Sequence, residues 1–378
     1  MSYGVYIHIP FCKKKCLYCD FPSYAGREAE MEPYAEALCR EIAAAGVKLR
    51  GMGKAATIYV GGGTPSALPV SLLSRILRTA QAVIPTEDNF EFTVEVNPGT
   101  VTLETMTALS TVGVNRVSIG AQAFDDAQLA RLGRVHTAKD IRDAVRWARA
   151  ALIVDVSVDL MYGLPGQTME DLKWSVGSAM DLAVTHISVY GLTIEEGTPF
   201  AREKAAGLLA LPSEEAEGEM YDYLTETLPR FGFARYEISN FARRGFVCRH
   251  NLGYWSDRPY IGFGAAAHSY HDGMRTANTK DIGAYIKAVM SGNSPAHEEE
   301  RVTREKHIEE FCFLALRTAE GIDREKFSRT FGCEVESLYA GAIESLSQKG
   351  MLESTPTHLR LTSLGMKFGN RAFESFLL

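Results

Sequence analysis

Long hydrophobic runs are missing from this sequence of 378 residues, in which no stretch approaches 18 consecutive apolar residues. A membrane-spanning helix needs about 20 such residues, so no span through a bilayer is expected. The N-terminal residues also lack the basic segment and the small-residue cleavage site of a secretory signal. These absences predict a cytoplasmic protein.

An excess of positive charge is missing as well, because the formal net charge is -7 at pH 7. Proteins that bind nucleic acid through its phosphates usually carry a basic stripe. The acidic balance therefore argues against a nucleic-acid partner. The hydrophobic share of 46% and the charged share of 23% are ordinary for a globular protein, which argues against a disordered chain.

The seven cysteines are unevenly distributed. In a reducing compartment, clustered thiols bind metals or take part in catalysis and do not form disulfides. Three of the cysteines fall within eight residues, and we expect the four isolated ones to be small buried side chains. The isolated ones are Cys39, Cys248, Cys312 and Cys333.

Short runs rich in valine and isoleucine alternate with amphipathic segments, a pattern typical of βα units and a parallel sheet. The predicted strands are Val5–Pro10, Thr57–Val60, Glu91–Val96, Arg116–Gly120, Val154–Asp159 and His186–Leu192. The predicted helices between them are Tyr34–Ala45, Leu72–Ala82, Leu103–Leu109, Ala138–Ala150 and Met169–Ala183. Six such units are two short of a closed eight-stranded barrel, so we expect an incomplete (β/α)6 TIM-like barrel that is open on one side.

Polar or glycine- and proline-rich segments follow all six predicted strands. They are Cys12–Cys19, Gly61–Pro65, Glu95–Pro98, Gly120–Gln122, Asp159–Gly166 and Tyr190–Thr193. The carboxyl ends of the strands share one mouth in a βα barrel, and chemistry gathers there. One site assembled from all six segments is therefore expected.

The pattern changes after about residue 200. We expect a helix at Ser213–Phe231, a short strand at Tyr236–Ser239 and a charged, solvated hinge at Glu298–Lys306. A small winged-helix-like module should follow, with helices near Ile308–Leu316, Arg324–Phe331 and Leu338–Lys349 and a β-wing at Leu352–Leu361. The predicted division is residues 1–235 for the barrel, 236–300 for a connecting region and 301–378 for this module.

Cys12-x3-Cys16-x2-Cys19 lies on a loop directly after the first strand. Thiolates are soft ligands that favour iron–sulfur clusters or zinc. A [4Fe-4S] cluster usually takes four cysteines, so three would leave one iron open to another ligand. Zinc is the alternative, and it would need a fourth ligand such as His8 or Asp20. Zinc sites usually combine two separated cysteine pairs, and no second pair exists here, which favours the cluster.

This spacing on the first loop of a six-unit barrel resembles the radical S-adenosylmethionine (SAM) superfamily, and the resemblance covers residues 3–200. It implies a [4Fe-4S] cluster on Cys12, Cys16 and Cys19, with SAM bound to the open iron and cleaved to a 5′-deoxyadenosyl radical. It further implies that Gly61–Pro65 binds the methionine amine of SAM, since glycines let a backbone approach a ligand closely.

Within the superfamily, the chain resembles the branch that contains coproporphyrinogen dehydrogenases and heme chaperones of the HemW type. The positions that this resemblance assigns to the cluster-bound SAM are Tyr6, Gly62 and Glu95. The positions that it assigns to a second SAM, as in the dehydrogenase, are Tyr18, Gly63, Thr64, Gln122, Arg134 and Asp159.

The sequence departs from the dehydrogenases in two places. Their motif continues Cys-x-Cys after the third ligand, whereas Asp20-Phe21 follows Cys19 here, and their long N-terminal extension is absent. The heme chaperones share these departures, and they also share the segments Tyr162–Thr168 and His250–Trp255. The resemblance to them spans nearly the whole chain and implies a protein that binds heme and passes it to acceptor proteins, including membrane-associated ones. The cluster and SAM would assist dimerisation or transfer in such a protein.

His250 is the candidate axial ligand to heme iron, beside the flat side chains of Tyr254 and Trp255. A hydrogen-bonding structural histidine is the alternative, and Cys248 is a second candidate ligand. Covalent attachment is not expected, because the sequence has no Cys-x-x-Cys-His. An enzyme that acts on coproporphyrinogen or another porphyrin remains the competing function.

Overall fold

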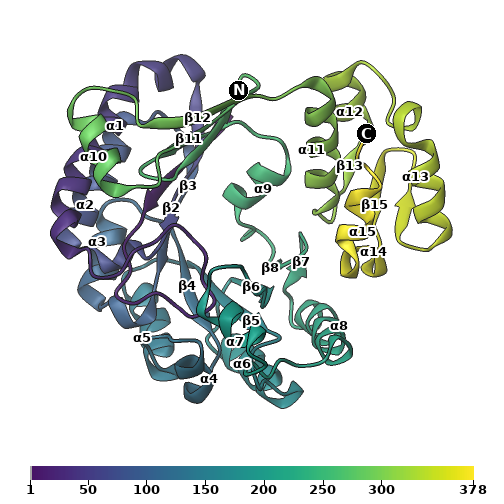
Figure 1. Ribbon diagram of the computed structural model, residues 1–378, viewed down its shortest axis with the longest axis horizontal. Coiled ribbons are helices and arrows are strands. Elements are labelled where there is room, and N and C mark those ends of the chain that lie inside the picture. The colour runs from purple at the N-terminus through teal and green to yellow at the C-terminus, as the bar shows by residue number, and fades with distance from the viewer. Residues whose placement is uncertain (1) are drawn as a thin grey trace.

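The computed structural model describes residues 2–378. Its centre is a curved sheet of twelve strands in the order β12-β11-β10-β9-β1-β2-β3-β4-β5-β6-β8-β7. Strands β1 to β6 are parallel, and helices cover their outer face (Figure 1). The edge strands β12 and β7 do not pair with each other in the described part of the chain. The expected incomplete (β/α)6 barrel with an appended C-terminal module is confirmed.

The barrel and its extension contain most of the secondary structure. The parallel strands are β1 Ser2–Ile9, β2 Lys54–Gly62, β3 Thr86–Val96, β4 Arg116–Gln122, β5 Asp155–Tyr162 and β6 His186–Gly191. The helices around them are α1 Met31–Met52, α2 Val70–Val83, α3 Leu103–Thr111, α4 Asp126–Arg131, α5 Ala138–Ala150 and α6 Met169–Asp181. The following elements are α7 Pro199–Ala205, α8 Glu214–Arg230, β7 Ala234–Arg235, β8 Asn240–Ala242, α9 Arg249–Trp255, β9 Tyr260–Phe263, β10 His268–His271, β11 Met274–Asn278, α10 Ile282–Met290 and β12 Ala296–Arg301.

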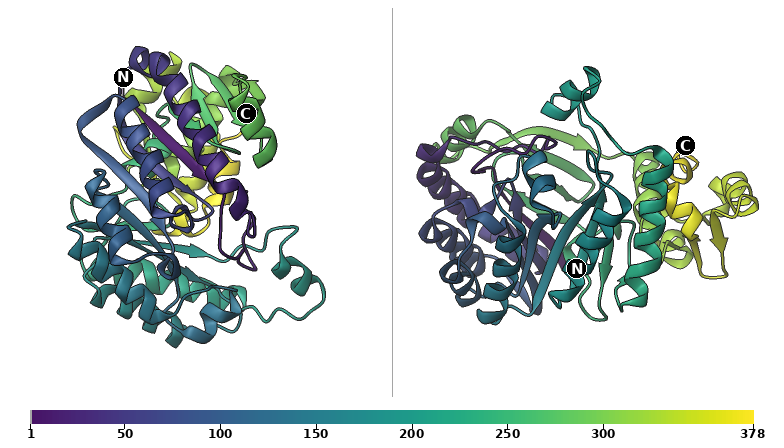
Figure 2. Two further views of the ribbon diagram at one scale, coloured as in Figure 1. Left: turned by 90° about the vertical axis from the view of Figure 1, so that its left-hand side faces the viewer. Right: turned by 90° about the horizontal axis from the view of Figure 1, so that it is seen from below.

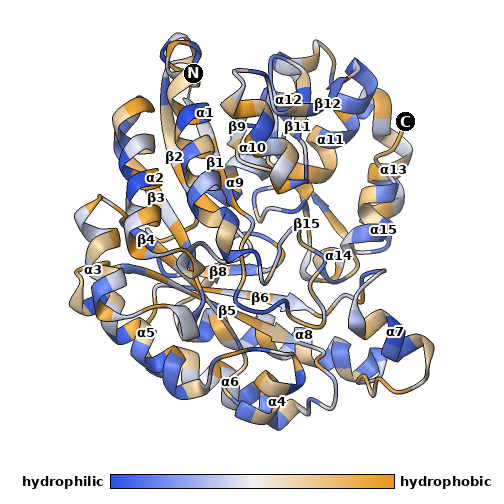
Figure 3. Cartoon of the chain, turned by 60° about the vertical axis from the view of Figure 1, so that its left-hand side comes forward, coloured by the Kyte–Doolittle hydropathy of each residue, from blue (hydrophilic) through white to orange (hydrophobic). Residues whose placement is uncertain are grey.

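Local sequence explains why these elements form. Threonine N-caps with capping boxes begin three of the outer helices, at Thr102, Thr137 and Thr168. In β1, Val5, Ile7 and Ile9 alternate and are fully buried, so every second side chain packs under the outer helices. Figure 3 shows hydrophobic colour along the strands and polar colour on outer helices such as α4 and α7. The α7 segment projects from the body of the barrel (Figure 2).

The predicted strand at Tyr236–Ser239 was wrong, because these residues form the turn between β7 and β8. The Glu237 carboxylate accepts a hydrogen bond from the Ser239 backbone N–H at 2.8 Å, which ties the turn together. The predicted hinge at Glu298–Lys306 was also wrong over its first part, which belongs to β12. Charged side chains suit an edge strand because they keep the edge solvated.

The C-terminal module has its own cluster of buried apolar side chains, separate from the barrel core. Its elements are α11 Arg304–Leu316, β13 Ile322–Asp323, α12 Arg324–Phe331, α13 Glu336–Gln348, β14 Leu352–Ser354, β15 His358–Leu361, α14 Ser363–Lys367 and α15 Gly369–Glu374. Residues 236–300 contribute β8 to β12 to the large sheet, and β9 lies parallel to β1. The division at residues 235 and 300 stays a prediction. Among residues 2–378, no helix has both the length and the apolar character that crossing a bilayer requires.

Helix α9 lies between the sheet and the C-terminal module (Figure 1). Glu91 of β3 fixes its first turn, because the carboxylate accepts hydrogen bonds from the backbone N–H groups of Arg249 at 2.7 Å and His250 at 3.1 Å. Beyond its other end, Asp257 accepts a hydrogen bond from His307 of α11 at 2.8 Å. The helix therefore connects the barrel to the C-terminal module.

Candidate functional site at the mouth of the barrel

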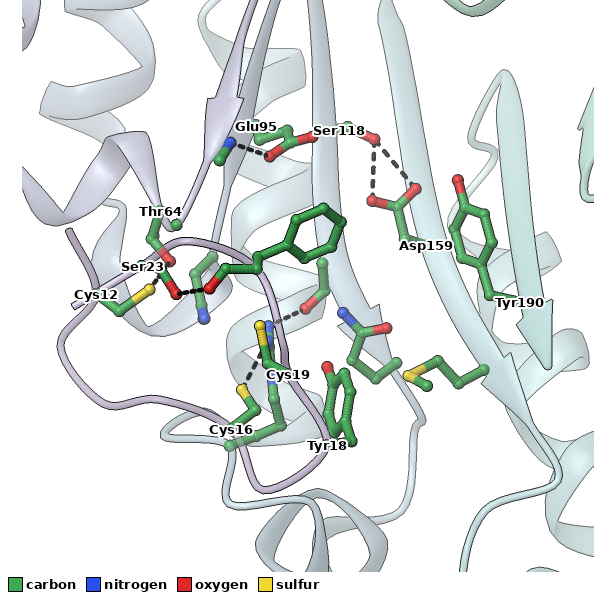
Figure 4. Close-up of a pocket in the computed structure, with 18 of the residues that line it drawn as sticks. Cys12, Cys16, Tyr18, Cys19, Ser23, Thr64, Glu95, Ser118, Asp159 and Tyr190 are labelled. Atoms are coloured by element: carbon green, nitrogen blue, oxygen red, sulfur yellow. Dashed lines mark hydrogen bonds between the residues drawn. The ribbon is translucent and has the colours of Figure 1, made fainter. Parts of the chain in front are cut away.

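The three clustered cysteines line a cavity of about 450 Å³ at the carboxyl ends of the strands (Figure 4). Their loop is held by backbone hydrogen bonds from Cys12 N–H to Tyr24 C=O at 2.9 Å and from Leu17 N–H to Leu132 C=O at 3.1 Å. All three are free thiols and partly exposed. The loop thus directs three soft ligands into one cavity.

Polar neighbours hold two of these sulfur atoms. The Arg134 guanidinium donates to Cys16 Sγ at 3.4 Å and to the Gly120 carbonyl at 2.5 Å. The Thr64 hydroxyl lies 3.6 Å from Cys12 Sγ. Burial raises the pKa of the Cys19 thiol, so binding of a metal there would have to displace a proton. A guanidinium beside a sulfur favours the thiolate form that a metal requires.

His8 is not free to be a fourth ligand for zinc. One ring nitrogen bonds the Tyr6 hydroxyl at 2.9 Å and the other bonds the Pro22 carbonyl at 2.9 Å. Burial lowers the pKa of this ring, which fits a neutral histidine with one donor and one acceptor. Asp20, the other candidate, is exposed and lines the same cavity as the three cysteines. Among residues 2–378, no three histidine, cysteine, aspartate or glutamate side chains form a group that could hold a single metal ion.

Two glycines at the end of β2 are needed because neighbouring groups come too close for a side chain. A Cβ atom on Gly62 would lie 2.5 Å from the His8 ring, and this residue has a φ of +115°. A Cβ atom on Gly63 would lie 2.7 Å from the Phe11 carbonyl oxygen and 3.0 Å from Cys12 Sγ. The two glycines therefore let this segment pack closely against His8 of β1 and against the start of the cysteine loop.

Glu95 and Asp159 place two carboxylates in the cavity. Glu95 accepts hydrogen bonds from the Tyr59 hydroxyl at 2.7 Å and from the Gly62 N–H at 3.2 Å. Burial raises the pKa of Glu95 to about 7 and also raises the pKa of Asp159. Asp159 accepts hydrogen bonds from Ser118 at 3.0 and 3.1 Å. Both groups suit a ligand that brings hydrogen-bond donors or positive charge.

Eleven of the thirteen predicted site residues line this one cavity, including Tyr18 and Gln122. Gln122 ends β4 with a φ of +70°, a conformation that is uncommon outside glycine. Tyr6 lies just outside the cavity lining, with its ring stacked on Tyr59 at 6.4 Å between centroids. The thirteenth, His250, lies elsewhere.

His250 is buried against the inner face of β2. Its Nδ1 bonds the Thr57 hydroxyl at 2.8 Å, its Nε2 bonds the Tyr254 hydroxyl at 3.0 Å, and its ring stacks on Tyr59. Burial lowers its pKa to about 3, so the ring is neutral at pH 7. Because both nitrogens are occupied, a role as axial ligand would require these two hydrogen bonds to break. Cys248 is fully buried too, and burial raises its pKa.

The sequence interpretation missed several residues that line the cavity. Tyr59, Arg116, Ser118 and Ser188 point inward from three parallel strands, β2, β4 and β6. Arg116 is 2% exposed and lies 3.6 Å from the Asp155 carboxylate. An arginine inside a strand of buried residues was the available signal, because such a charge needs a partner or a ligand.

Comparisons with known proteins agree with this geometry. The family model of the radical SAM superfamily matches residues 6–177, and the model of the HemN C-terminal domain matches residues 302–368. The protein named heme chaperone HemW from Bacillus subtilis is 38% identical over 375 residues, which cover 99% of each chain. The protein of that name from Escherichia coli is 32% identical over 380 residues, covering 99% of this chain and 98% of the relative.

A solved structure shows the same fold. Coproporphyrinogen III oxidase (HemN) from Escherichia coli superposes with a TM-score of 0.86 at 21% identity, and the match covers 99% of this chain and 90% of the other. The match therefore extends over the barrel, α9 and the C-terminal module together. On the sequence matches and this shared fold, the chain belongs to the HemW family of radical SAM proteins.

Proposed function

We propose that this protein is a heme chaperone that binds heme and transfers it to acceptor proteins. The observation that carries the proposal is similarity over 99% of the chain to relatives named heme chaperone HemW. Membrane-associated proteins are the acceptors that we expect, and a homodimer is the assembly that the cluster and SAM would assist. Nucleic acid is not an expected partner, given the net charge of -7.

Cys12, Cys16 and Cys19 would hold a [4Fe-4S] cluster, which fits three partly exposed thiols around one cavity. When bound, such a cluster supplies one open iron and a single electron. Gly62 and Glu95 would hold SAM beside that iron, with Tyr6 supporting His8 under the glycine segment. Arg134 would keep Cys16 ionised through its hydrogen bond to the sulfur.

The same cavity would also take a second SAM. Gln122, Arg134 and Asp159 line it together with Tyr18, Gly63 and Thr64 of the cysteine and glycine segments. The Thr64 hydroxyl and the Asp159 carboxylate would offer acceptors to such a ligand. SAM carries the bond-breaking chemistry, and these residues orient it and exclude water.

A porphyrin-converting radical SAM enzyme, such as a coproporphyrinogen dehydrogenase, is the second candidate. The convergence of eleven predicted site residues on one cavity favours it, because a carrier of heme needs no complete SAM site. Phe21 argues against it: this residue stands where the dehydrogenase motif has a further cysteine, and its side chain is 63% exposed beside the cavity.

Anaerobic purification followed by two separate assays distinguishes the heme chaperone from the porphyrin-converting enzyme. The chaperone should bind heme, seen as a Soret band that saturates near one heme per chain, and should leave coproporphyrinogen unconverted in the presence of SAM and a reductant. The Cys16→Ser variant is the control for cluster dependence in both assays. Conversion of coproporphyrinogen without heme binding above background would reject the chaperone in favour of the enzyme.

A further inference from the structure

The loop between α4 and α5 contacts the mouth of the barrel at three points. The Leu132 carbonyl accepts a hydrogen bond from the backbone of the cysteine loop. Arg134 donates to Cys16 Sγ and to the Gly120 carbonyl. The third contact is made by His136, which is 4% exposed and does not line the cavity of the three cysteines, the cysteine cavity. A buried histidine that faces no ligand space must act on its neighbours.

The imidazole of His136 bridges the ends of two neighbouring strands. Its Nε2 lies 3.1 Å from the Ala121 carbonyl oxygen of β4, and its Nδ1 lies 3.0 Å from Oδ1 of Asn97, the residue after β3. Burial, together with nearby Arg134, lowers the pKa of His136 to about 4, so the ring is neutral at pH 7 and carries one N–H. The Asn97 amide can turn either its oxygen or its NH2 toward the ring, whereas a carbonyl can only accept. The N–H is therefore on Nε2 and donates to Ala121.

The Ala121 carbonyl belongs to the peptide group that precedes Gln122, whose backbone is unusual. Gln122 has a φ of +70°, which residues other than glycine rarely adopt unless the surrounding structure holds them there. The pairing register between β4 and β5 also shifts between Gly120 and Gln122, so the pairing skips Ala121. Two groups hold this carbonyl, because it accepts hydrogen bonds from His136 and from the Ala123 N–H at 3.0 Å.

The irregular backbone at this point decides where the Gln122 side chain lies. Gln122 is paired with Leu160, which is buried in the apolar core, yet Gln122 itself lines the cysteine cavity. A register shift of this kind re-aims the side chain that follows it. A Cβ atom on Gly120 would lie 3.2 Å from Gln122 Nε2 and 3.2 Å from Arg134 Nη2. The amide and the guanidinium therefore lie together over Gly120 in the cavity wall.

We propose that His136 is a positioning residue of the SAM site, because its hydrogen bond to the Ala121 carbonyl keeps Gln122 in the left-handed conformation that turns its amide into the cysteine cavity. This inference rests on the proposed function, in which Gln122 helps to hold the second SAM. His136 acts through Gln122 and touches no ligand itself. Asn97 lines the cavity too, so the same ring also ties the ends of β3 and β4 together at the site.

Two substitutions separate the hydrogen bond from the space that the ring fills. His136→Leu fills similar space without an N–H, whereas His136→Gln brings a side-chain NH2 to the same carbonyl. In calorimetric titrations of anaerobic protein, His136→Leu should bind SAM about tenfold more weakly, the upper range for one hydrogen bond, and His136→Gln should bind it nearly as the wild type does. Equal losses in both variants would show that the ring only fills space and would overturn the proposal. His297→Leu, the same change at an exposed position on β12, is the matched control and should behave as the wild type.

A double-mutant cycle tests whether His136 acts through Gln122. Gln122→Ala combined with His136→Leu should bind SAM within about twofold of Gln122→Ala alone, because the second change removes support for a side chain that is already gone. Losses that multiply would overturn the proposal. Circular dichroism and iron content should be unchanged in all these variants, which shows that the fold and the cysteine loop are intact.

A crystal structure of His136→Leu tests the positioning without SAM. Gln122 should leave the left-handed region, and its amide should leave the cavity wall. A φ that stays near +70° with the amide in place would overturn the proposal, whatever the affinities are. SAM affinity that Gln122→Ala leaves unchanged would instead reject the second SAM of the proposed function, and the crystal structure would still decide the role of His136.

Discussion

The Glu95 carboxyl group should make both SAM affinity and folding stability depend on pH near neutrality. Burial raises its pKa from 4.5 to about 7, while Tyr59 and Gly62 donate hydrogen bonds to it. The folded protein therefore holds this proton more tightly than the unfolded chain does. The free energy of unfolding should consequently fall as pH rises between about 4.5 and 7.

The size of the effect follows from the shift. A change of 2.5 pH units at about 1.36 kcal/mol per unit gives at most about 3 kcal/mol of stability lost by ionising Glu95. Glu95→Gln cannot ionise, so it should be more stable than the wild type at pH 8 by up to that amount. The two proteins should differ little at pH 5, where Glu95 is protonated. Asp159 is present in both proteins, and because its charge helps to raise the pKa of Glu95, part of the difference comes from repulsion between the two carboxylates.

SAM binding should show the opposite dependence on pH and should strengthen as the pH rises. The ionised carboxylate accepts hydrogen bonds and balances the sulfonium charge of SAM, so the affinity of the wild type should fall about tenfold from pH 8 to pH 6. Glu95→Gln should bind weakly and without this step. Anaerobic urea unfolding and calorimetric SAM titrations at each pH measure the two effects, with exposed Glu226→Gln as the control. Equal pH profiles for the wild type and Glu95→Gln in both measurements would refute the reasoning.

Three further substitutions test other parts of the molecule. Cys16→Ser should abolish the brown colour and most of the iron of an anaerobic preparation, which should otherwise contain about four irons per chain; zinc as the only metal of the wild type would contradict this. Gly62→Ala should keep its iron but lose SAM affinity in calorimetry. Gly63→Ala should lose iron, because its Cβ would lie 3.0 Å from Cys12 Sγ. Iron loss in Gly62→Ala but not in Gly63→Ala would reverse these roles of the two glycines. Phe327→Ala, in the core of the C-terminal module, should lower the free energy of unfolding by about 3–5 kcal/mol in urea titrations, and a loss below about 1 kcal/mol would show a poorly packed module.

The barrel was predictable because its signal is repeated. Each strand is a short apolar run followed by a polar segment, and parallel strands necessarily bring those segments to one mouth. Glu95, Gln122 and Asp159 could therefore be placed together before any contact was known. The turn at Tyr236–Ser239 could not be predicted, because a short run with aromatic and β-branched residues has the composition of a strand. Whether such a run forms a strand depends on whether another strand pairs with it.

Side chains deeper in the barrel escaped prediction for a related reason. Tyr59 and Arg116 occupy ordinary alternating strand positions, and only the curvature of the open sheet shows which face is the interior. The environment of His250 depends on Thr57, which is 193 positions away in the sequence. No local pattern encodes such a contact, so the sequence could not show that Thr57 and Tyr254 occupy both nitrogens of this imidazole.

Helix α9 also has a thermodynamic consequence. Asn251 in its first turn lines the cysteine cavity, and Tyr254 and Trp255 in its last turn line a second cavity at the junction with the C-terminal module, the junction cavity. Hydrogen bonds hold this helix of seven residues at its first turn and beyond its last, so a ligand that displaced it from one cavity should also change the shape of the other. Such coupling is reciprocal: whatever factor SAM in the cysteine cavity imposes on the affinity of a ligand in the junction cavity, that ligand must impose on SAM affinity. The two factors are measured by titrating each ligand with the other absent and then saturating, and they should be equal.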